Sequence, residues 1–339
     1  MFLLYASIAL IAPYSIGCKP SKSGVFDNVT VLIKGLDKTT TEDSILIEFD
    51  DSLSKYLNNK PSEIVIIRNQ FIPKLETNSV ADLTKVQNLT LAGNGIREIQ
   101  QGTFQNLPNL KVLNLSRNSI EEVRIGIFTD LRMHDLYLDH NKISRIGYKA
   151  FSKLHLKNLF LRNNRISRWS KDWFADSSVL VLDMGYNLIE ELPPNAFHLM
   201  SKPANNSMSI IFTGNQVKKL NSHVFSGVST YDRIVLDGNS MDRLAPGVFD
   251  GVRRVNVLNL NNNSLSEVNA DVLGTVQIDV LMLEDNKLRC LSTDIFRMEE
   301  LDIDGNPISC FCVKTWLDWR DRHSNPSIYH ITNLEEECI

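Results

Sequence analysis

The chain has 339 residues, 43% of them hydrophobic, and a formal net charge of −4 at pH 7. This length and apolar content are enough for a long continuous core. A slight acidic excess, without a basic run or a phosphate-binding glycine loop, argues against a nucleic-acid-binding protein.

Residues 1–17 (MFLLYASIALIAPYSIG) are apolar and predict a secretory signal peptide. Ser15 and Gly17 are the small residues expected just before a cleavage site at Cys18. The alternative is a membrane anchor, but an anchor requires about 20 apolar residues, and Pro13 interrupts this stretch. We therefore expect a secreted, extracellular protein, and no later apolar run is long enough to suggest a membrane span.

Residues 18–60 precede the regular part of the sequence and are expected to form an amino-terminal cap. Residues 29–33 (VTVLI) and 45–49 (ILIEF) have the β-branched and apolar composition of strands. We expect both strands to extend the sheet of the following region. Cys18 is the one cysteine before residue 290, so packing rather than a cysteine cluster must close this end.

Residues 61–305 repeat one apolar pattern, with a period of 23 to 24 residues in most units. In residues 110–133 this pattern is Leu110, Leu113, Leu115 and Asn118, followed by further apolar residues. The asparagines that mark successive units are Asn69, Asn94, Asn118, Asn141, Asn164, Asn187, Asn215, Asn239, Asn263, Asn286 and Asn306. Self-similarity at such a period is the signature of a solenoid, in which each unit buries its apolar face against its neighbours.

Each position of the unit has a physical role. The alternation Leu113-x-Leu115 predicts a short strand, and stacked units place these strands side by side in a parallel sheet. The amide of Asn118 can bond backbone groups of the following turn and of the adjacent coil. Ten residues after the asparagine of most units, an apolar side chain, usually phenylalanine, fills the interior of the coil. We call this series the phenylalanine spine: Phe104, Phe128, Phe151, Phe174, Phe197, Phe225, Phe249, Leu273 and Phe296.

One interval is longer than the others. Between Asn187 and Asn215 the chain carries an insertion, SKPANNSMS, in which residues 203–207 are typical of an exposed loop. The loop is either a tolerated insertion or a recognition loop.

Residues 306–339 are expected to close the carboxy-terminal end. Trp316 and Leu317 on a short helix over residues 313–322 would cover the last coil. Zinc is the alternative use of Cys310-x-Cys312, but no histidine pair accompanies it, and a secretory start favours disulfides. Cys290 and Cys310 each follow a repeat asparagine by four residues, which places them about 5 Å apart on adjacent coils. Pairing of Cys290 with Cys310, and of Cys312 with Cys338, is therefore one possibility.

The consensus L-x-x-L-x-L-x-x-N-x-L, repeated in register, resembles the extracellular leucine-rich repeat family over residues 60–339. This resemblance implies an α/β repeat fold, a curved leucine-rich-repeat solenoid with a parallel β-sheet on its concave face. The period and the phenylalanine resemble the subtype of Toll-type ectodomains, Slit-like proteins and matrix proteins. The terminal cysteines resemble the family's carboxy-terminal cap, which implies a Cys310–Cys338 bond and leaves Cys290 to pair with Cys312.

Outward residues of the strands form the concave surface and are free to bind. In the central units the ligand-binding candidates are Tyr137, His140, Phe160, Arg162 and Tyr186. Aromatic and arginine side chains are the usual anchors of protein interfaces. The alternative for the histidines here, as metal ligands or an acid–base pair, lacks an accompanying nucleophile motif. We predict no enzymatic activity, no metal site and no cofactor.

Acidic residues dominate the same outward positions farther along the chain, with Arg233 as the one cation. The predicted acidic patch comprises Asp237, Asp279, Glu284, Asp285, Asp302 and Asp304. It either serves solubility or steers a basic partner. Glycosylation sequons occur at Asn28, Asn88, Asn114, Asn205 and Asn262.

The sequence thus predicts a secreted, glycosylated recognition protein that binds another extracellular protein or a glycan. The family resemblance favours innate immunity. The alternatives are the ectodomain of an adhesion or signalling receptor, or a matrix-binding structural protein.

Overall fold

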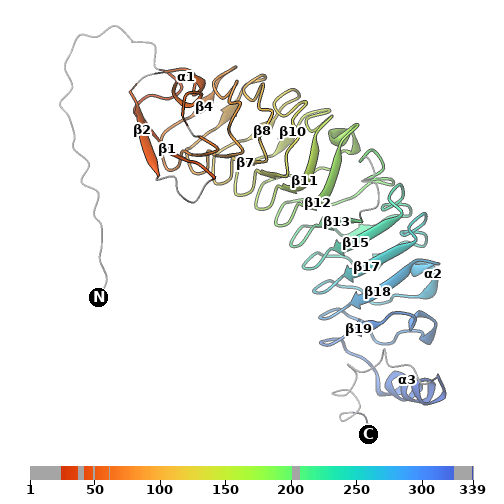
Figure 1. Ribbon diagram of the computed structural model, residues 1–339. Helices are drawn as coiled ribbons and strands as arrows, with labels where there is room; N and C mark the ends of the chain where they lie inside the picture. The colour runs from red at the N-terminus through yellow and green to blue at the C-terminus, as the bar shows by residue number, and fades with distance from the viewer. Residues whose placement is uncertain are drawn as a thin grey trace, which may run out of the picture.

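The computed structural model describes residues 24–36, 42–48, 50–60, 62–200, 207–323 and 338. These residues form a curved solenoid with a long sheet on its concave face (Figure 1). The signal peptide predicted for residues 1–17, the sequon at Asn205 and most of the insertion lie outside the described residues. None of the helices in the described ranges is long and apolar enough to cross a lipid bilayer.

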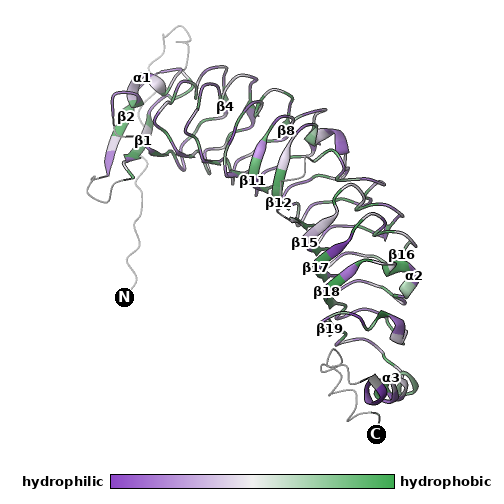
Figure 2. Ribbon diagram, turned by 45° about the vertical axis from the view of Figure 1, so that its right-hand side comes forward, coloured by the Kyte–Doolittle hydropathy of each residue, from purple (hydrophilic) through white to green (hydrophobic). Residues whose placement is uncertain are grey.

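Within the described residues, thirteen strands form the main sheet, in the order β19-β18-β17-β15-β13-β12-β11-β9-β7-β5-β3-β1-β2. Their bounds are β1 Val29–Lys34, β2 Asp43–Ile47, β3 Ile64–Ile66, β5 Asn88–Thr90, β7 Val112–Asn114, β9 Asp135–Tyr137, β11 His155–Phe160, β12 Ser178–Asp183, β13 Met208–Ile211, β15 Thr230–Val235, β17 Arg254–Asn259, β18 Gln277–Met282 and β19 Glu300–Asp302. Single strands such as β11 and β18 carry both hydrophilic and hydrophobic residues (Figure 2). In β11 the buried residues Leu156 and Leu159 are each flanked by more exposed ones, because neighbouring side chains point to opposite faces of a sheet.

The remaining elements are short, apart from the last helix. Two-stranded pairs join β4 Lys74–Leu75 to β6 Glu98–Ile99, β8 Glu122–Val123 to β10 Arg145–Ile146, and β14 Lys219–Leu220 to β16 Arg243–Leu244. The helices are α1 Ser54–Leu57, α2 Ala270–Leu273 and α3 Cys310–His323, with 3₁₀ turns η1 Lys171–Phe174 and η2 Thr293–Ile295.

The amino-terminal end is closed by a hairpin. β1 pairs antiparallel with both β2 and β3, whereas β3 and all following strands of the sheet pair in parallel. Phe26, Leu53 and Leu57 are fully buried beneath this end. The two predicted strands therefore extend the sheet, with an antiparallel orientation that the sequence pattern did not indicate.

Each ladder asparagine ties two neighbouring coils together. Oδ1 of Asn164 accepts a hydrogen bond from the N–H of Ile143 (2.9 Å), and its Nδ2 group donates to the carbonyls of Leu138 (3.0 Å) and Leu161 (2.9 Å). The same arrangement recurs at Asn118, Asn141, Asn187, Asn215, Asn239, Asn263, Asn286 and Asn306. Buried asparagines thus satisfy backbone groups that the turn would otherwise leave unpaired.

The first unit departs from the predicted register. Val65 lies opposite Leu89, so Gln70, and not Asn69, corresponds to Asn94. The N–H of Gln70 donates to Oδ1 of Asn94 at 2.9 Å, whereas Asn69 has a left-handed backbone with φ 54°. The assignment of Asn69 as a ladder position is wrong, because asparagine also suits the left-handed position beside the ladder.

The phenylalanine spine fills the interior in two stacked runs. Ring centroids of neighbours are 5.4 to 6.2 Å apart within the runs Phe104, Phe128, Phe151, Phe174 and Phe197, Phe225, Phe249. Trp169 bridges the two runs, with centroid distances of 5.8 Å to Phe174 and 5.1 Å to Phe197. Its Nε1–H donates to the carbonyl of Ala196 at 3.1 Å, so a larger ring fills the gap that precedes the insertion.

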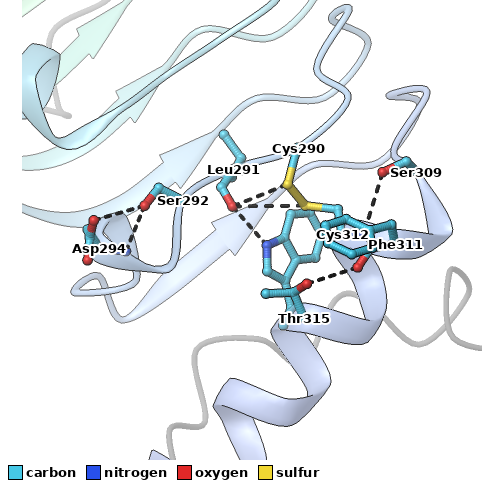
Figure 3. The surroundings of a disulfide bond; sticks show 9 residues. Cys290, Leu291, Ser292, Asp294, Ser309, Phe311, Cys312 and Thr315 are labelled. Carbon is cyan, nitrogen blue, oxygen red and sulfur yellow. Dashed lines mark hydrogen bonds between the residues drawn. A yellow bond between two sulfur atoms is a disulfide. The ribbon is translucent and has the colours of Figure 1, made fainter.

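Helix α3 covers the last coil. Trp316 is fully buried, and its Nε1–H donates to the carbonyl of Leu291 at 2.9 Å. Disulfides join Cys290 to Cys312 and Cys310 to Cys338, the pairing that the family resemblance favoured. Figure 3 shows the first of these bonds tying the preceding coil to the first turn of α3.

Candidate binding site on the concave face

Tyr137 and Phe160 lie side by side on neighbouring strands. β9 and β11 pair in parallel with Tyr137 opposite Phe160, and the two rings stack with centroids 4.6 Å apart and an interplanar angle of 14°. Burial raises the pKa of the Tyr137 hydroxyl, and the charges of Asp135 and Asp139 raise it further. The pair therefore presents a broad aromatic surface whose rings are already held by each other.

Arg162 is oriented by the next coil. Its guanidinium carbon lies 4.2 Å from the centroid of the Tyr186 ring, and its Nη1 lies 3.9 Å from Oδ2 of Asp183. A Cβ atom at Gly185 would come within 3.0 Å of the same Nη1. The glycine therefore leaves the room that the arginine occupies.

A second glycine shapes the other side of Tyr186. A Cβ atom at Gly214 would lie 2.9 Å from two carbons of the Tyr186 ring, so the ring packs directly over this glycine. Arg162 and Gly214 thus lie against the same ring. Tyr186 still exposes 47% of its surface, which leaves it available to a partner.

Two carboxylates lie beneath this arrangement. Asp183 is 9% exposed, and burial raises its pKa, while the N–H of Gly185 (2.8 Å) and the charge of Arg162 oppose the rise. The charge of Asp139 raises the pKa of Asp183 further, so the two acids repel each other. Oδ1 of Asp139 is buried and has no hydrogen-bond partner among the described residues.

His140 is held by polar neighbours on both sides. Its Nδ1 lies 2.9 Å from Oδ2 of Asp139, and Nδ2 of Asn163 lies 3.2 Å from its Nε2. Because the amide donates to Nε2, Nδ1 carries the hydrogen and donates to Asp139. The group that contacts Nε2 of the imidazole is the amide of Asn163, and not a hydroxyl or thiol nucleophile. Among the described residues no group of three or more His, Cys, Asp or Glu side chains could hold a metal ion.

All five predicted residues gather on three consecutive coils; we call Tyr137, His140, Phe160, Arg162 and Tyr186 the central patch. The sequence did not predict that Asp139, Asp183, Gly185 and Gly214 orient the residues of the central patch.

An apolar column continues the concave face beyond the central patch. Half-buried aliphatic side chains occupy outward positions of β13, β15, β17 and β18, namely Ile211, Val235, Val257, Val280 and Met282. Ile211 pairs with both Asp183 and Val235 across the strands, so the column begins beside the central patch. Sequence reasoning missed this column, although Ile211, Val235 and Met282 stand at the repeat position of Tyr137 and Phe160. Val257 and Val280 stand two residues earlier in the unit, at the position of Asn158.

The acidic patch is smaller than predicted. Asp279 forms an ion pair with Arg254 at 2.5 Å, and Asp237 accepts a hydrogen bond from Oγ1 of Thr213 at 2.7 Å. The prediction of Arg233 as the one opposing cation is therefore wrong, because Arg254 reaches the next strand. The acids of the patch without a cationic partner among the described residues are Asp237 and, at the last coils, Glu284, Asp285, Asp302 and Asp304. A hydrogen bond with Asp302, burial and the neighbouring acids raise the pKa of Glu284 to about 7.

The sequons differ in accessibility. Asn28 and Asn262 are exposed in left-handed turns, whereas Asn88 and Asn114 are half-buried on β5 and β7. Oδ1 of Asn114 accepts hydrogen bonds from the N–H and the hydroxyl of Ser116, at 2.9 and 2.7 Å. Asn114 also pairs with Tyr137 across the strands, so a glycan there would crowd the central patch.

Comparison with known proteins supports the repeat architecture. The family model described as leucine rich repeat matches residues 84–143, 154–202, 206–265 and 229–288, which together cover more than half of the chain. No curated protein matches the sequence.

Two solved structures resemble the fold. The LRIM1 leucine-rich repeat domain has a TM-score of 0.50 and 18% sequence identity, over 74% of this chain and 77% of that chain. The LRIM1/APL1C complex has a TM-score of 0.52 and the same identity, over 74% of this chain and 50% of that chain. The present chain thus spans half the length of the chain it matches in the complex.

Proposed function

This chain belongs to the leucine-rich repeat family, and we propose that it is an extracellular, non-catalytic recognition protein that binds a partner protein through the central patch. The observation that carries the proposal is the fixed geometry of the patch. Tyr137 stacks on Phe160, and Arg162 stacks on Tyr186, so contacts within the chain hold all four side chains. Binding then loses little side-chain entropy.

The composition of the patch also suits a protein partner. Aromatic rings and an arginine stand at its centre, and such residues contribute most of the binding energy in protein interfaces. The apolar column that begins beside it would extend the buried area. A structural neighbour is a complex of two proteins, LRIM1/APL1C, which supports protein recognition by this fold.

The charge of the concave face favours a partner with a basic surface. Asp135, Asp139 and Asp183 surround the central patch, and the acidic patch lies farther along the same face. Complementary charge accelerates encounter and excludes wrong partners. The resemblance to Toll-type repeats supports innate-immune recognition as the biological setting.

The test is capture of partners from the extracellular fluid of the source organism. The parent protein and a double variant, Phe160→Ala with Arg162→Ala, are compared as bait. A matched control carries Phe71→Ala with Arg165→Ala, since both of these side chains are exposed away from the central patch. The proposal requires a protein that the parent and the control retain and the patch variant loses. Equal capture by all three would contradict it.

A further inference from the structure

A second charged surface lies on the flank where the strands begin. Successive coils bring Lys111, His134 and Lys157 together in one row, because the N–H of His134 bonds to the carbonyl of Lys111 (2.7 Å) and the N–H of Lys157 to that of His134 (2.9 Å). Arg132 and His155 form a second row through a parallel bridge. With Lys153, these six exposed residues are the basic flank.

The basic flank is hollowed around Arg132. A groove of about 440 Å³ is lined by Asp130, Arg132, Lys153, His155 and Asp176. An adjoining groove of about 290 Å³ shares Arg132 and His155 and reaches Lys111 and His134. A third, of about 520 Å³, also shares Arg132. Arg132 is thus the point at which three grooves meet.

The cations of this flank have no carboxylate partner at ion-pair distance in the described part of the chain. Lys111, Arg132, Lys153 and Lys157 take part in none of its ion pairs. On the opposite flank, by contrast, Arg124 and Arg145 pair with Glu122 at 3.1 and 3.5 Å. The charge of the basic flank is therefore free to act on an external group.

We propose that the basic flank binds a sulfated polysaccharide, with Arg132 and Lys153 contacting sulfate groups. Cations on three coils, about 5 Å apart per coil, match a chain with repeated anionic groups. Asp130 and Asp176 lie in the same groove, and carboxylates accept hydrogen bonds from sugar hydroxyls. A purely anionic ligand would gain nothing from these two acids.

The polar lining favours a saccharide over a protein partner. Exposed residues of the three grooves are polar except Pro108, and no exposed aromatic or aliphatic anchor lies among them. Protein interfaces are centred on such anchors. The site is also separate from the central patch, whose residues lie toward the other ends of the strands.

The test measures binding of a short heparin fragment to the full-length secreted protein. Comparators are a hyaluronan fragment of equal length, which lacks sulfate, and poly-glutamate, which mimics an acidic protein segment. The parent should bind heparin, with affinity falling as salt rises, and should bind both comparators at least about tenfold more weakly. Absence of heparin binding at low salt, or equal binding of either comparator, would overturn the proposal.

Two double variants localise the site. Arg132→Glu with Lys153→Glu should weaken heparin binding at least about tenfold, since charge reversal replaces attraction with repulsion. Lys142→Glu with Arg165→Glu makes the same change in net charge on the opposite flank and should change binding less than about threefold. A thermal unfolding transition at the same melting temperature as the parent protein shows that each variant is folded. If both variants lost heparin affinity equally, the overall electrostatic field of the protein, and not the basic flank, would attract the polymer, and the proposal would be overturned.

Discussion

The guanidinium carbon of Arg162 lies 4.2 Å from the ring centroid of Tyr186, on the following coil. Two glycines make this contact possible. Gly185 leaves room for the guanidinium, and Gly214 lies directly against the tyrosine ring. Because Gly185 and Gly214 lack side chains, Arg162 and Tyr186 can stack on each other in the central patch.

Replacement of Gly214 tests this relationship. Its φ is 64°, so alanine should cost about 1 to 2 kcal/mol of stability through the left-handed backbone alone. A larger loss is expected, because the new Cβ would lie 2.9 Å from the Tyr186 ring and displace it. Gly238→Ala is the matched control, with φ 63° and its nearest neighbour atom at 3.6 Å. Chemical unfolding should show the greater loss in Gly214→Ala; equal losses would mean that the ring does not rest on the glycine.

Phe151 tests the phenylalanine spine. It is fully buried between Phe128 and Phe174, so Phe151→Ala should lower the free energy of unfolding by about 3 to 5 kcal/mol through lost burial and a cavity. Hydrogen exchange should increase mainly in the neighbouring coils, since repeat stability is largely a nearest-neighbour property. Phe71→Ala removes the same ring where it is 79% exposed and should change stability by less than about 0.5 kcal/mol.

The disulfides can be assigned by cleavage at one exposed residue. Phe311 separates Cys310 from Cys312 and is 82% exposed, so chymotrypsin can divide the two cysteines into different peptides. Non-reducing mass spectrometry should then recover Cys290 linked to Cys312 and Cys310 linked to Cys338. Peptides linking Cys290 to Cys310 would contradict the structure. Free Cys312 would mean that the cap is open.

Glu284 predicts a specific dependence of stability on pH. Its pKa is raised to about 7 by the hydrogen bond with Asp302, above the ordinary value of 4.5. Between these two values the folded protein binds more protons than the unfolded chain, so stability falls as pH rises through the window. Glu284→Gln should flatten this fall, because its amide donates to Asp302 at every pH. The melting temperature of the variant, relative to that of the parent, should therefore be higher at pH 8 than at pH 5. An equal difference at both pH values would contradict the raised pKa of Glu284.

The repeat pattern was sufficient to predict the solenoid, the buried ladder from Asn94 onward and the placement of the central-patch residues on consecutive coils, because each depends on position within one unit. Leucine alternation determines which side chains face inward, and the period brings equivalent positions together. Tyr137 and Phe160 are neighbours for this reason, since they occupy equivalent positions of adjacent strands. The predicted helix of the cap begins three residues earlier than expected, at Cys310, which forms the disulfide with Cys338.

Features that depend on contacts between non-equivalent positions did not follow from the pattern. Arg254 reaches Asp279 on the neighbouring strand, and Trp169 fills the gap between two runs of the phenylalanine spine. Both depend on side-chain length and direction rather than on register. The same holds for Gly185 and Gly214, since the role of a glycine lies in the side chain that packs against it.

The affinity of the partner for Phe160→Ala and Arg162→Ala tests the central claim most directly. Once capture has identified the partner, each variant should bind it more weakly by on the order of 1 to 4 kcal/mol. Phe71→Ala and Asn262→Gln should bind like the parent, since both positions are exposed outside the central patch. If Phe160→Ala and Arg162→Ala bound the partner as tightly as the parent protein, the central patch would not be the binding site.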